Sequence, residues 1–551
     1  MSLSFNPTPF DLLLGLKQWL IVVGVSLLVI GISATFMSLM VLGKTGPIQI
    51  LGYAREAITD LFGTSWRRCL ALTQLTFFEA LRRKTLMVFA VFAILFMFAG
   101  WFMSDVTADP SLQVKAYISF VLRAISWLIL PVVLLLSCWG LPEDIRARSL
   151  HTVVTKPVRR HEIVLGRILG YSLIGGLVLA VMGFVGYVWI VRQLRGNDTM
   201  RSHLIARVPI FGELSFVDRD GRDRDTQGEL IQAGINVGDE NPFRSFVEGA
   251  TSARARWDFG QIDTSRLANN TLVLESSLQS FRTHKGNMKQ GLLCQFTLIN
   301  QATEVRVPLT PFEVQEFRRN TYNVAERNRS LSDVNGKEVD LIKDVLSGGA
   351  LRVEVQCLSG GQFLGMARPD LFIRLPDNSF LASYVKCLGS IGLMMLMVVV
   401  LGVMFGCFVK GPVATVATAF VVILGRTFHG FMEQVATGVS KANPAFEHKG
   451  RGILDSLIRI PTHQTPSVDF EDSFGTRIVK TLDNIELGGL WAVKHLIPDF
   501  STFDTTEYAA NAFDVPWAES LLPSLAVTIG YGLPWIVVGY FFLKFRELEA
   551  K

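Results

Sequence analysis

Apolar residues gather along the chain in long uninterrupted stretches that are separated by charged connections. Five stretches contain no Asp, Glu, Lys or Arg, and a sixth contains only Arg123. About 20 mostly apolar residues cross the hydrocarbon of a bilayer, because a helix of that length satisfies its own backbone there. The pattern therefore predicts spanning helices over residues 18–42, 85–104, 116–139, 168–191, 387–407 and 520–543, with a weaker seventh over 411–432.

A second pattern, alternation with period two, fills the polar segment of residues 192–382. Alternation of this kind is typical of antiparallel strands with one buried face. The segment is long enough to bury a core of its own, so we expect an antiparallel β-sandwich domain. The alternating runs lie at residues 272–275, 292–299, 305–309, 351–357 and 371–375.

The remaining polar segment, residues 433–518, is expected to be partly helical, because Ile478, Leu482 and Ile485 recur at helix spacing before Gly488-Gly489 interrupts the run. The predicted fold class is a polytopic α-helical membrane protein of about seven spanning helices with an inserted β-sandwich. Its expected parts are an extra N-terminal helix (1–43), an interfacial helix with three spanning helices and a loop (44–191), the β-rich domain (192–382), two spanning helices (383–432), the partly helical segment (433–518) and the last helix with its tail (519–551).

The orientation follows from where Lys and Arg fall in the short loops. Residues 44–84 contain seven bases against three acids, and residues 141–167 contain six against three, so both connections should be cytoplasmic. Residues 105–114 carry two acids and no base, and residues 427–519 are richer in acids, so both should lie outside. We expect the N-terminus and the β-rich domain outside and the C-terminus inside, in the cytoplasmic membrane.

Composition supports a membrane protein and removes several other classes. Half of the residues are apolar, 18% are charged, and the mean hydropathy is +0.36. Six cysteines in 551 residues are too few for a disulfide scaffold. The net charge of +5 is spread thinly rather than concentrated on one face, so a lipid membrane is an expected partner and nucleic acid is not.

Three single residues have two interpretations each. Cys294 and Cys357 both fall on the apolar side of their strands, where they form either an external disulfide or two buried thiols. Arg123 lies inside an apolar stretch, where a charge costs at least ~2.5 kcal/mol on insertion scales. It either lines a pathway, facing a partner acid or a cavity, or extends to the headgroups.

The sequence Leu358-Ser-Gly-Gly-Gln362 matches the signature pentapeptide of ABC-family ATPases letter for letter. That motif binds phosphate because a helix begins directly after it, whereas here it follows an alternating run, so we interpret it as a Gly-Gly hairpin turn. The chain has no intact phosphate-binding loop, zinc motif or nucleophile elbow. We therefore expect no enzymatic site, no metal and no cofactor in this chain, with any ATP bound by a partner.

Two cytoplasmic features carry the functional interpretation. Residues 65–84 place Trp66, Leu70, Phe77 and Leu81 on one helical face beside several arginines, which predicts an interfacial helix. Residues 141–167 then combine a Pro and two acids at a helix start with a Lys-Pro step and a Glu-Ile-Val-Leu-Gly-Arg entry into the next span. Such a loop can transmit the motion of a docked partner, although its bases could also serve only to set orientation.

This loop resembles the first cytoplasmic loop of the type-2, exporter class of ABC-transporter permeases. The likeness includes the interfacial helix, Pro498 to Phe500 and Phe545 to Glu547, but it does not include the first helix or the β-rich domain. Within the loop, Arg148 and Ser149 stand where the family usually has a Gly-Thr pair. The resemblance implies a permease that couples ATP hydrolysis in a separate ABC ATPase subunit to movement of a substrate, and that pairs with a second or homologous permease. It implies docking through Glu143, Asp144, Arg146, Arg148, Lys156, Pro157, Arg159, Arg160 and Glu162.

An anchored extracytoplasmic receptor or assembly protein without transport activity is the alternative, and a membrane-embedded enzyme is a third. An anchor has no need of an interfacial helix that leads into one span and a Pro-containing loop between two others.

Overall fold

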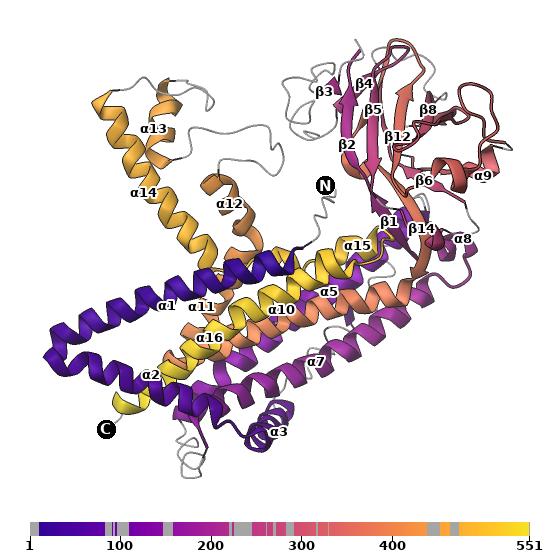
Figure 1. Ribbon diagram of the computed structural model, residues 1–551. Helices are drawn as coiled ribbons and strands as arrows, with labels where there is room; N and C mark the ends of the chain where they lie inside the picture. The colour runs from indigo at the N-terminus through magenta and orange to yellow at the C-terminus, as the bar shows by residue number, and fades with distance from the viewer. Residues whose placement is uncertain are drawn as a thin grey trace. The chain divides into compact units, whose positions relative to one another are not determined.

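The computed structural model describes residues 10–82, 91, 94–95, 110–146, 158–219, 223–224, 245–260, 262–267, 271–282, 291–315, 318–328, 330–437, 452–462 and 473–549. The chain divides into two compact units (Figure 1). A helical unit takes its residues from 8–204, 380–433 and 488–551. A second unit takes its residues from 205–379 and 434–487 and contains all the strands.

Six helices of the described chain are long and apolar enough to cross a membrane. They correspond to six of the seven predicted stretches, and the predicted stretch 85–104 lies almost wholly outside the described residues. The predicted interfacial helix is present as α3 (Trp66–Arg82). The candidate spans are Leu12–Met40, Pro110–Arg146, Arg160–Gln193, Phe380–Phe408, Gly411–Glu433 and Trp517–Lys544.

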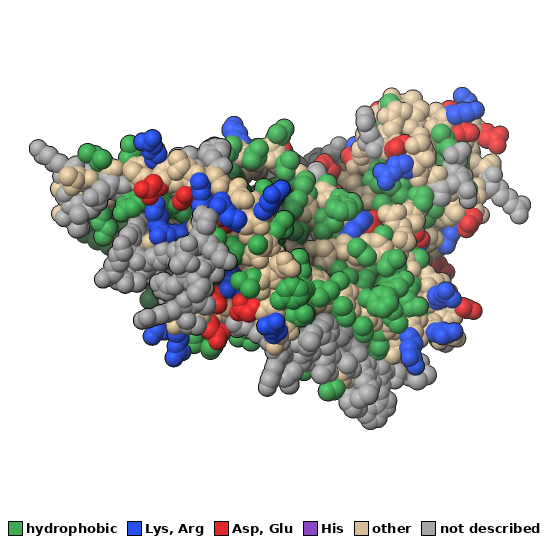
Figure 2. Space-filling view, turned by 90° about the horizontal axis from the view of Figure 1, so that it is seen from below, with side chains coloured by type: hydrophobic (Ala, Val, Ile, Leu, Met, Phe, Trp, Pro, Cys, Tyr) green, Lys and Arg blue, Asp and Glu red, His purple; other side chains and the backbone are tan. Residues whose placement is uncertain are grey.

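Five of these spans correspond to α1 (Leu12–Leu42), α5 (Pro110–Arg146), α7 (Arg160–Gln193), α10 (Phe380–Phe408) and α16 (Leu522–Glu549). The span from Gly411 is α11 (Gly411–Ile423), a π-turn η7 (Leu424–Phe428) and α12 (His429–Thr437). Helix α10 is the centre of the bundle, packed against α5, α7, α11 and α16 with Met397, Val398 and Val399 fully buried. Large apolar side chains such as Leu173, Leu177 and Phe184 of α7 face outward, and Figure 2 shows apolar patches on one face. This is the pattern of helices surrounded by lipid.

Helix α1 is exposed along most of its length and contacts α16 where Trp19 Nε1 donates to the carbonyl of Gly530 at 2.8 Å. A 3₁₀ turn η1 (Gly43–Thr45) then leads into α2 (Gly46–Phe62), which doubles back beside α1 (Figure 1). The sequence interpretation did not include α2.

The second unit holds three antiparallel sheets with strand orders β1-β14-β6-β11, β10-β8-β12-β5-β2-β3 with β9 on β8, and β4-β13-β7. All five predicted alternating runs are strands, namely β6, β8, β9, β12 and β14. The strands are β1 (Ile205–Phe211), β2 (Glu213–Val217), β3 (Asp223–Arg224), β4 (Ser245–Glu248), β5 (Arg254–Phe259), β6 (Val273–Ser276), β7 (Gln279–Arg282), β8 (Leu292–Asn300), β9 (Arg306–Pro308), β10 (Phe312–Val314), β11 (Asn320–Asn323), β12 (Leu351–Cys357), β13 (Gln362–Met366) and β14 (Leu371–Ser379).

The three sheets share one apolar core, in which Trp257, Leu274 and Leu364 come from different sheets and are fully buried. The β-rich region is shorter than the predicted 192–382, because α7 extends to Gln193, α8 (Asp198–Ser202) follows, and α10 begins at Phe380. The spanning helices therefore continue almost to the first and last strands.

Cys294 on β8 and Cys357 on β12 are direct cross-strand partners, and both are free, fully buried thiols. Burial raises the pKa of the Cys294 thiol well above its ordinary value, and burial also raises the pKa of Cys357. The structure thus contains the second of the two arrangements that the sequence left open.

Residues 358–361 form a turn between β12 and β13, with Gly361 at φ +67°. No helix begins there, which agrees with the rejection of a nucleotide site. The turn is nevertheless not a hairpin, because β12 and β13 pair with different neighbours and belong to different sheets. The expectation of a hairpin was wrong, since local sequence reports a turn but not the strand that follows it.

Residues 453–496 contain α13 (Ile453–Thr462) and α14 (Phe474–Leu496). The prediction of a helix through Ile478, Leu482 and Ile485 is confirmed, but the helix does not stop at Gly488-Gly489. Two glycines cost a helix about 2 kcal/mol together, which the packing of the last turns outweighs. Two contacts stabilise those last turns: Lys494 pairs with Glu433 at 3.4 Å, and the Tyr531 hydroxyl donates to the His495 carbonyl at 2.9 Å.

Candidate functional site: a buried carboxylate junction

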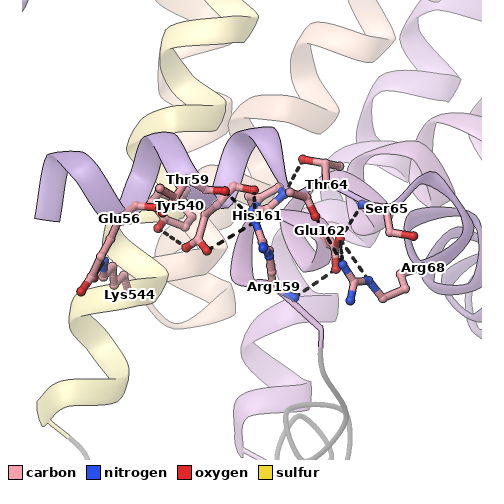
Figure 3. Close-up of polar contacts among 12 residues, drawn as sticks. Glu56, Thr59, Thr64, Ser65, Arg68, Arg159, His161, Glu162, Tyr540 and Lys544 are labelled. Carbon is pink, nitrogen blue, oxygen red and sulfur yellow. Dashed lines mark hydrogen bonds and ion pairs between the residues drawn. The ribbon is translucent and has the colours of Figure 1, made fainter.

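Glu162, in the first turn of α7, is the most deeply buried carboxylate among the described residues of the helical unit, with 0% of its surface exposed. It accepts the backbone N–H of Ser65 at 2.8 Å and that of Arg159 at 3.0 Å. It also accepts Nη2 and Nε of Arg68 at 2.9 and 3.2 Å. A buried carboxylate is tolerated only when it is paired and hydrogen-bonded, and these donors meet that need. Glu162 thereby fixes the start of α3 to the start of α7 (Figure 3).

Arg159, the N-cap residue of α7, joins the same junction to α2. Its Nη1 donates to the carbonyl oxygens of Thr59 and Asp60 at 2.7 and 2.8 Å. These carbonyls lie in the last turn of α2, where a cation is favoured by the helix dipole. A side chain at Gly63 would place its Cβ 1.7 Å from Arg159 Nη1, so the glycine permits this approach.

The end of α16 closes the junction from a third direction. Tyr540 donates to Asp60 Oδ2 at 2.8 Å, and Lys544 Nζ donates to Glu56 Oε2 at 2.6 Å. His161 Nε2 lies 2.7 Å from the hydroxyl of Thr64 in the α2–α3 connection. The Glu162 junction therefore ties α2, α3, α7 and α16 together, and consists of Glu56, Thr59, Asp60, Thr64, Ser65, Arg68, Arg159, His161, Glu162, Tyr540 and Lys544 (Figure 3).

A second ion-pair group lies along α7 from Glu162. The side chain of Arg167 is 10% exposed; its Nη1 donates to Glu79 of α3 at 2.7 Å, and its Nη2 pairs with Asp144 at the end of α5. One guanidinium therefore connects three helices. Removing one member of such a partly buried group leaves an uncompensated charge, which typically costs about 3–5 kcal/mol when the pair is fully buried.

Helices α3 and α7 approach closely because two glycines on α7 present no Cβ to α3. A Cβ at Gly166 would lie 2.5 Å from Leu72 Cβ, and a Cβ at Gly170 would lie 2.5 Å from Thr76 Cβ. The buried face of α3 consists of Cys69, Thr73, Thr76 and Ala80. Trp66 and Leu70 are exposed as an interfacial helix requires, whereas Phe77 and Leu81, predicted on the same face, are partly buried against the bundle.

Some of the residues predicted to dock an ATPase are exposed, and others point into the protein. Glu143 and Arg146 are exposed at the end of α5, and Arg160 is half-buried at the start of α7. Asp144, Arg159 and Glu162 point into the protein toward the contacts given above. Arg148, Lys156 and Pro157 lie outside the described residues, which leave out 147–157.

Sequence reasoning missed the contributions of α2 and α16, namely Glu56, Asp60, Tyr540 and Lys544. The spacing of Glu56 and Asp60 on one helical face was a usable signal. Nothing in the local sequence connects them with a helix almost 500 residues later, so the pairing itself required the fold.

The opposite end of the bundle carries a ring of ion pairs that includes Arg123. Residues 497–516, named here the acidic cap, contain η8 (Phe500–Phe503) and α15 (Thr506–Ala510), with Phe500 and Phe503 buried in the bundle core. Arg123, Lys386 and Arg426 each pair with an acid of the cap, and His429 lies beside a fourth. The pairs are Arg123–Glu507 at 2.7 Å, Lys386–Asp514 at 2.8 Å, Arg426–Asp504 at 3.4 Å and His429–Asp499 at 3.7 Å.

Arg123 thus has a partner acid, one of the surroundings expected for it, and its side chain remains 55% exposed. Among the described residues no group of three or more His, Cys, Asp or Glu side chains is placed to hold a metal ion. Comparison of the chain with protein-family models, curated proteins and solved structures finds no match. The class of protein is accordingly argued from its own residues and geometry.

Proposed function

We propose that this chain is the membrane-spanning permease subunit of an ATP-driven, exporter-type ABC complex. The likeness of residues 141–167 to the exporter-class loop suggests this function, and a permease requires several membrane-spanning helices, for which six helices of the described chain are long and apolar enough. The observation that carries the proposal is that ion pairs fix both helices that flank this loop, α5 before it and α7 after it. The helix before it, α5, is tied to α7 by the Asp144–Arg167 pair. The helix after it, α7, is tied to α3 by Glu162 with Arg68 and by Arg167 with Glu79.

The two ion-pair groups suggest how motion would be transmitted. A push on residues 147–157 reaches α5 and α7 directly, and reaches α3, α2 and α16 through the junction. Buried, close-packed contacts move as rigid bodies rather than stretching. A docked ATPase subunit would thereby displace several spanning helices together, whereas a flexible loop would absorb the motion.

Hydrolysis of ATP is assigned to the partner subunit, because Leu358–Gln362 lies in a turn between strands and the chain has no phosphate-binding loop. The excess of Lys and Arg around α2, α3 and residues 141–167 supports a cytoplasmic junction, with the β-rich region outside the cytoplasmic membrane. A second copy or a homologous permease would complete the pathway.

The test is affinity purification of the tagged chain in a mild detergent, with ATP turnover measured on the purified complex. We expect an ATPase subunit to be retained. Glu143→Lys with Arg146→Glu changes two exposed charges beside the loop and should weaken retention, because like charges at an interface cost several kcal/mol. If no ATPase accompanies the unmodified chain, the anchored receptor becomes the better account.

A further inference from the structure

In the α13–α14 hairpin, charged side chains are buried and apolar side chains are exposed, the reverse of the usual arrangement in water. Asp455, Arg459 and Asp483 are 7%, 6% and 5% exposed. Asp483 accepts the backbone N–H groups of Leu454 at 3.1 Å and Asp455 at 2.9 Å, and Arg459 is ion-paired with Asp455. The contact between the two helices is therefore built from charges and capping hydrogen bonds.

The apolar residues of the same two helices face outward. Phe474, Ile478, Leu482 and Ile485 follow one another at four-, four- and three-residue intervals along α14, and Phe474 and Ile485 are 83% and 68% exposed. Ile453, Leu457 and Ile460 form the corresponding row on α13, with Ile460 at 72%. A hairpin surrounded by water would place these side chains between its helices, because burial of each stabilises by about 1.5–3 kcal/mol.

Three observations favour lipid as the occupant of this surface. The hairpin lies in the chain between two helices apolar enough to span a membrane, Gly411–Glu433 and Trp517–Lys544. Exposed apolar side chains also lie on either side of the hairpin in the chain, at Phe428 and Phe431 before it and at Trp491 and Leu496 at the end of α14. Arg477 and Lys480 lie within one turn of Ile478 on α14, where long cationic side chains can reach headgroups.

We propose that the α13–α14 hairpin is inserted into the interface of the bilayer, with its two outward apolar rows in contact with lipid. This proposal rests on the proposed embedding of the spanning helices. The hairpin contributes a lipid-contacting surface in addition to the spans, and its buried charges hold the two helices together without occupying the surface that meets lipid.

The experiment is spin-label accessibility on the full chain in phosphatidylcholine–phosphatidylglycerol vesicles. Single cysteines replace Leu457, Ile485, Asn484 as the polar control on α14, and Phe420 as the reference on α11. The six native cysteines are all buried, and the unmodified chain gives the background. We expect labels at 457, 485 and 420 to collide more with dissolved oxygen than with a water-soluble nickel chelate, and the label at 484 to show the reverse.

The proposal is overturned if the label at 457 or 485 collides more with the nickel chelate, as the label at 484 should, because that position is then in water. It is also overturned if either label is reached by neither reagent, because a protein partner or a second copy then covers that position. In both cases position 420 still reports lipid, so the embedding of the spans survives. If position 420 also favours the nickel chelate, the embedding itself is wrong and this inference is lost with it.

Discussion

Glu162 is the residue on which the junction depends most, because it gathers four donors from three positions in the chain. The resemblance of the cytoplasmic loop to the exporter-class loop implies docking through Glu162. Its burial was not readable from sequence, because three of its four donors belong to Ser65 and Arg68, nearly a hundred positions earlier. The same holds for Asp144, whose partner Arg167 is not among the predicted docking residues.

Replacing Glu162 with glutamine is expected to lower the free energy of unfolding by about 2 kcal/mol, because hydrogen bonds to an ionised group contribute roughly 1.5–3 kcal/mol. The estimate is held low since the Arg68 side chain is 34% exposed and can rehydrate. Thermal unfolding in detergent can be followed with a thiol-reactive dye, as all six cysteines are buried. Glu143→Gln, at an exposed position, should change stability by less than about 0.5 kcal/mol. Equal melting temperatures for the two variants would contradict the assigned role of Glu162.

Cys294 and Cys357 give a pH dependence with a definite sign. Burial raises the pKa of both thiols, so the folded β-rich region holds these protons more tightly than the unfolded chain. Their contribution to stability is complete below the ordinary thiol pKa of about 8.5 and is lost as pH rises above it. The urea concentration at which Cys294 becomes open to alkylation, measured by mass spectrometry, should therefore fall with rising pH. A constant midpoint through that range, or a mass showing the two cysteines already joined, would refute the prediction.

Among the elements, strands and apolar helices were predictable because each carries a local period. Alternation located β8 and β12, and long apolar runs located α5, α7 and α10. Helix α2 was missed since its residues are only moderately apolar, and the division into three sheets was missed since strand pairing is not local. The close approach of α3 to α7 was also not predictable from local sequence, because it depends on Gly166 and Gly170 packing against Leu72 and Thr76, which lie far away in the chain.

The α3–α7 contact predicts opposite effects for two glycines of one helix. Gly170→Ala should lower stability by about 1–3 kcal/mol, because the new Cβ would lie 2.5 Å from Thr76 Cβ and 3.1 Å from the Thr73 carbonyl oxygen. Gly176→Ala meets nothing within 4 Å and should leave stability unchanged or raise it by up to about 1 kcal/mol. The thiol-dye melt measures both, and a tolerated Gly170→Ala would mean that the helices are not in contact.

At the scale of the whole molecule, orientation decides whether the junction and the β-rich region can have the proposed roles. Cysteines at Glu143 and at Val334, which is 68% exposed in the β-rich region, mark the two sides. An impermeant maleimide applied to intact cells should modify Val334→Cys, and should modify Glu143→Cys only after permeabilisation. The opposite result would invert the topology and move the loop away from any cytoplasmic partner.

The most direct test of the central claim is whether residues beside the loop touch an ATPase in the cell. A photo-crosslinking amino acid at Glu143 is compared with the same group at Val334, and the adducts are identified by mass spectrometry after illumination of intact cells. The account predicts that the Glu143 position captures a protein with a phosphate-binding loop, that Val334 does not, and that Glu143 adducts increase when that protein is overproduced. Capture of lipid alone at Glu143, or the same protein at both positions, would contradict the claim that this chain is driven by a docked ATPase.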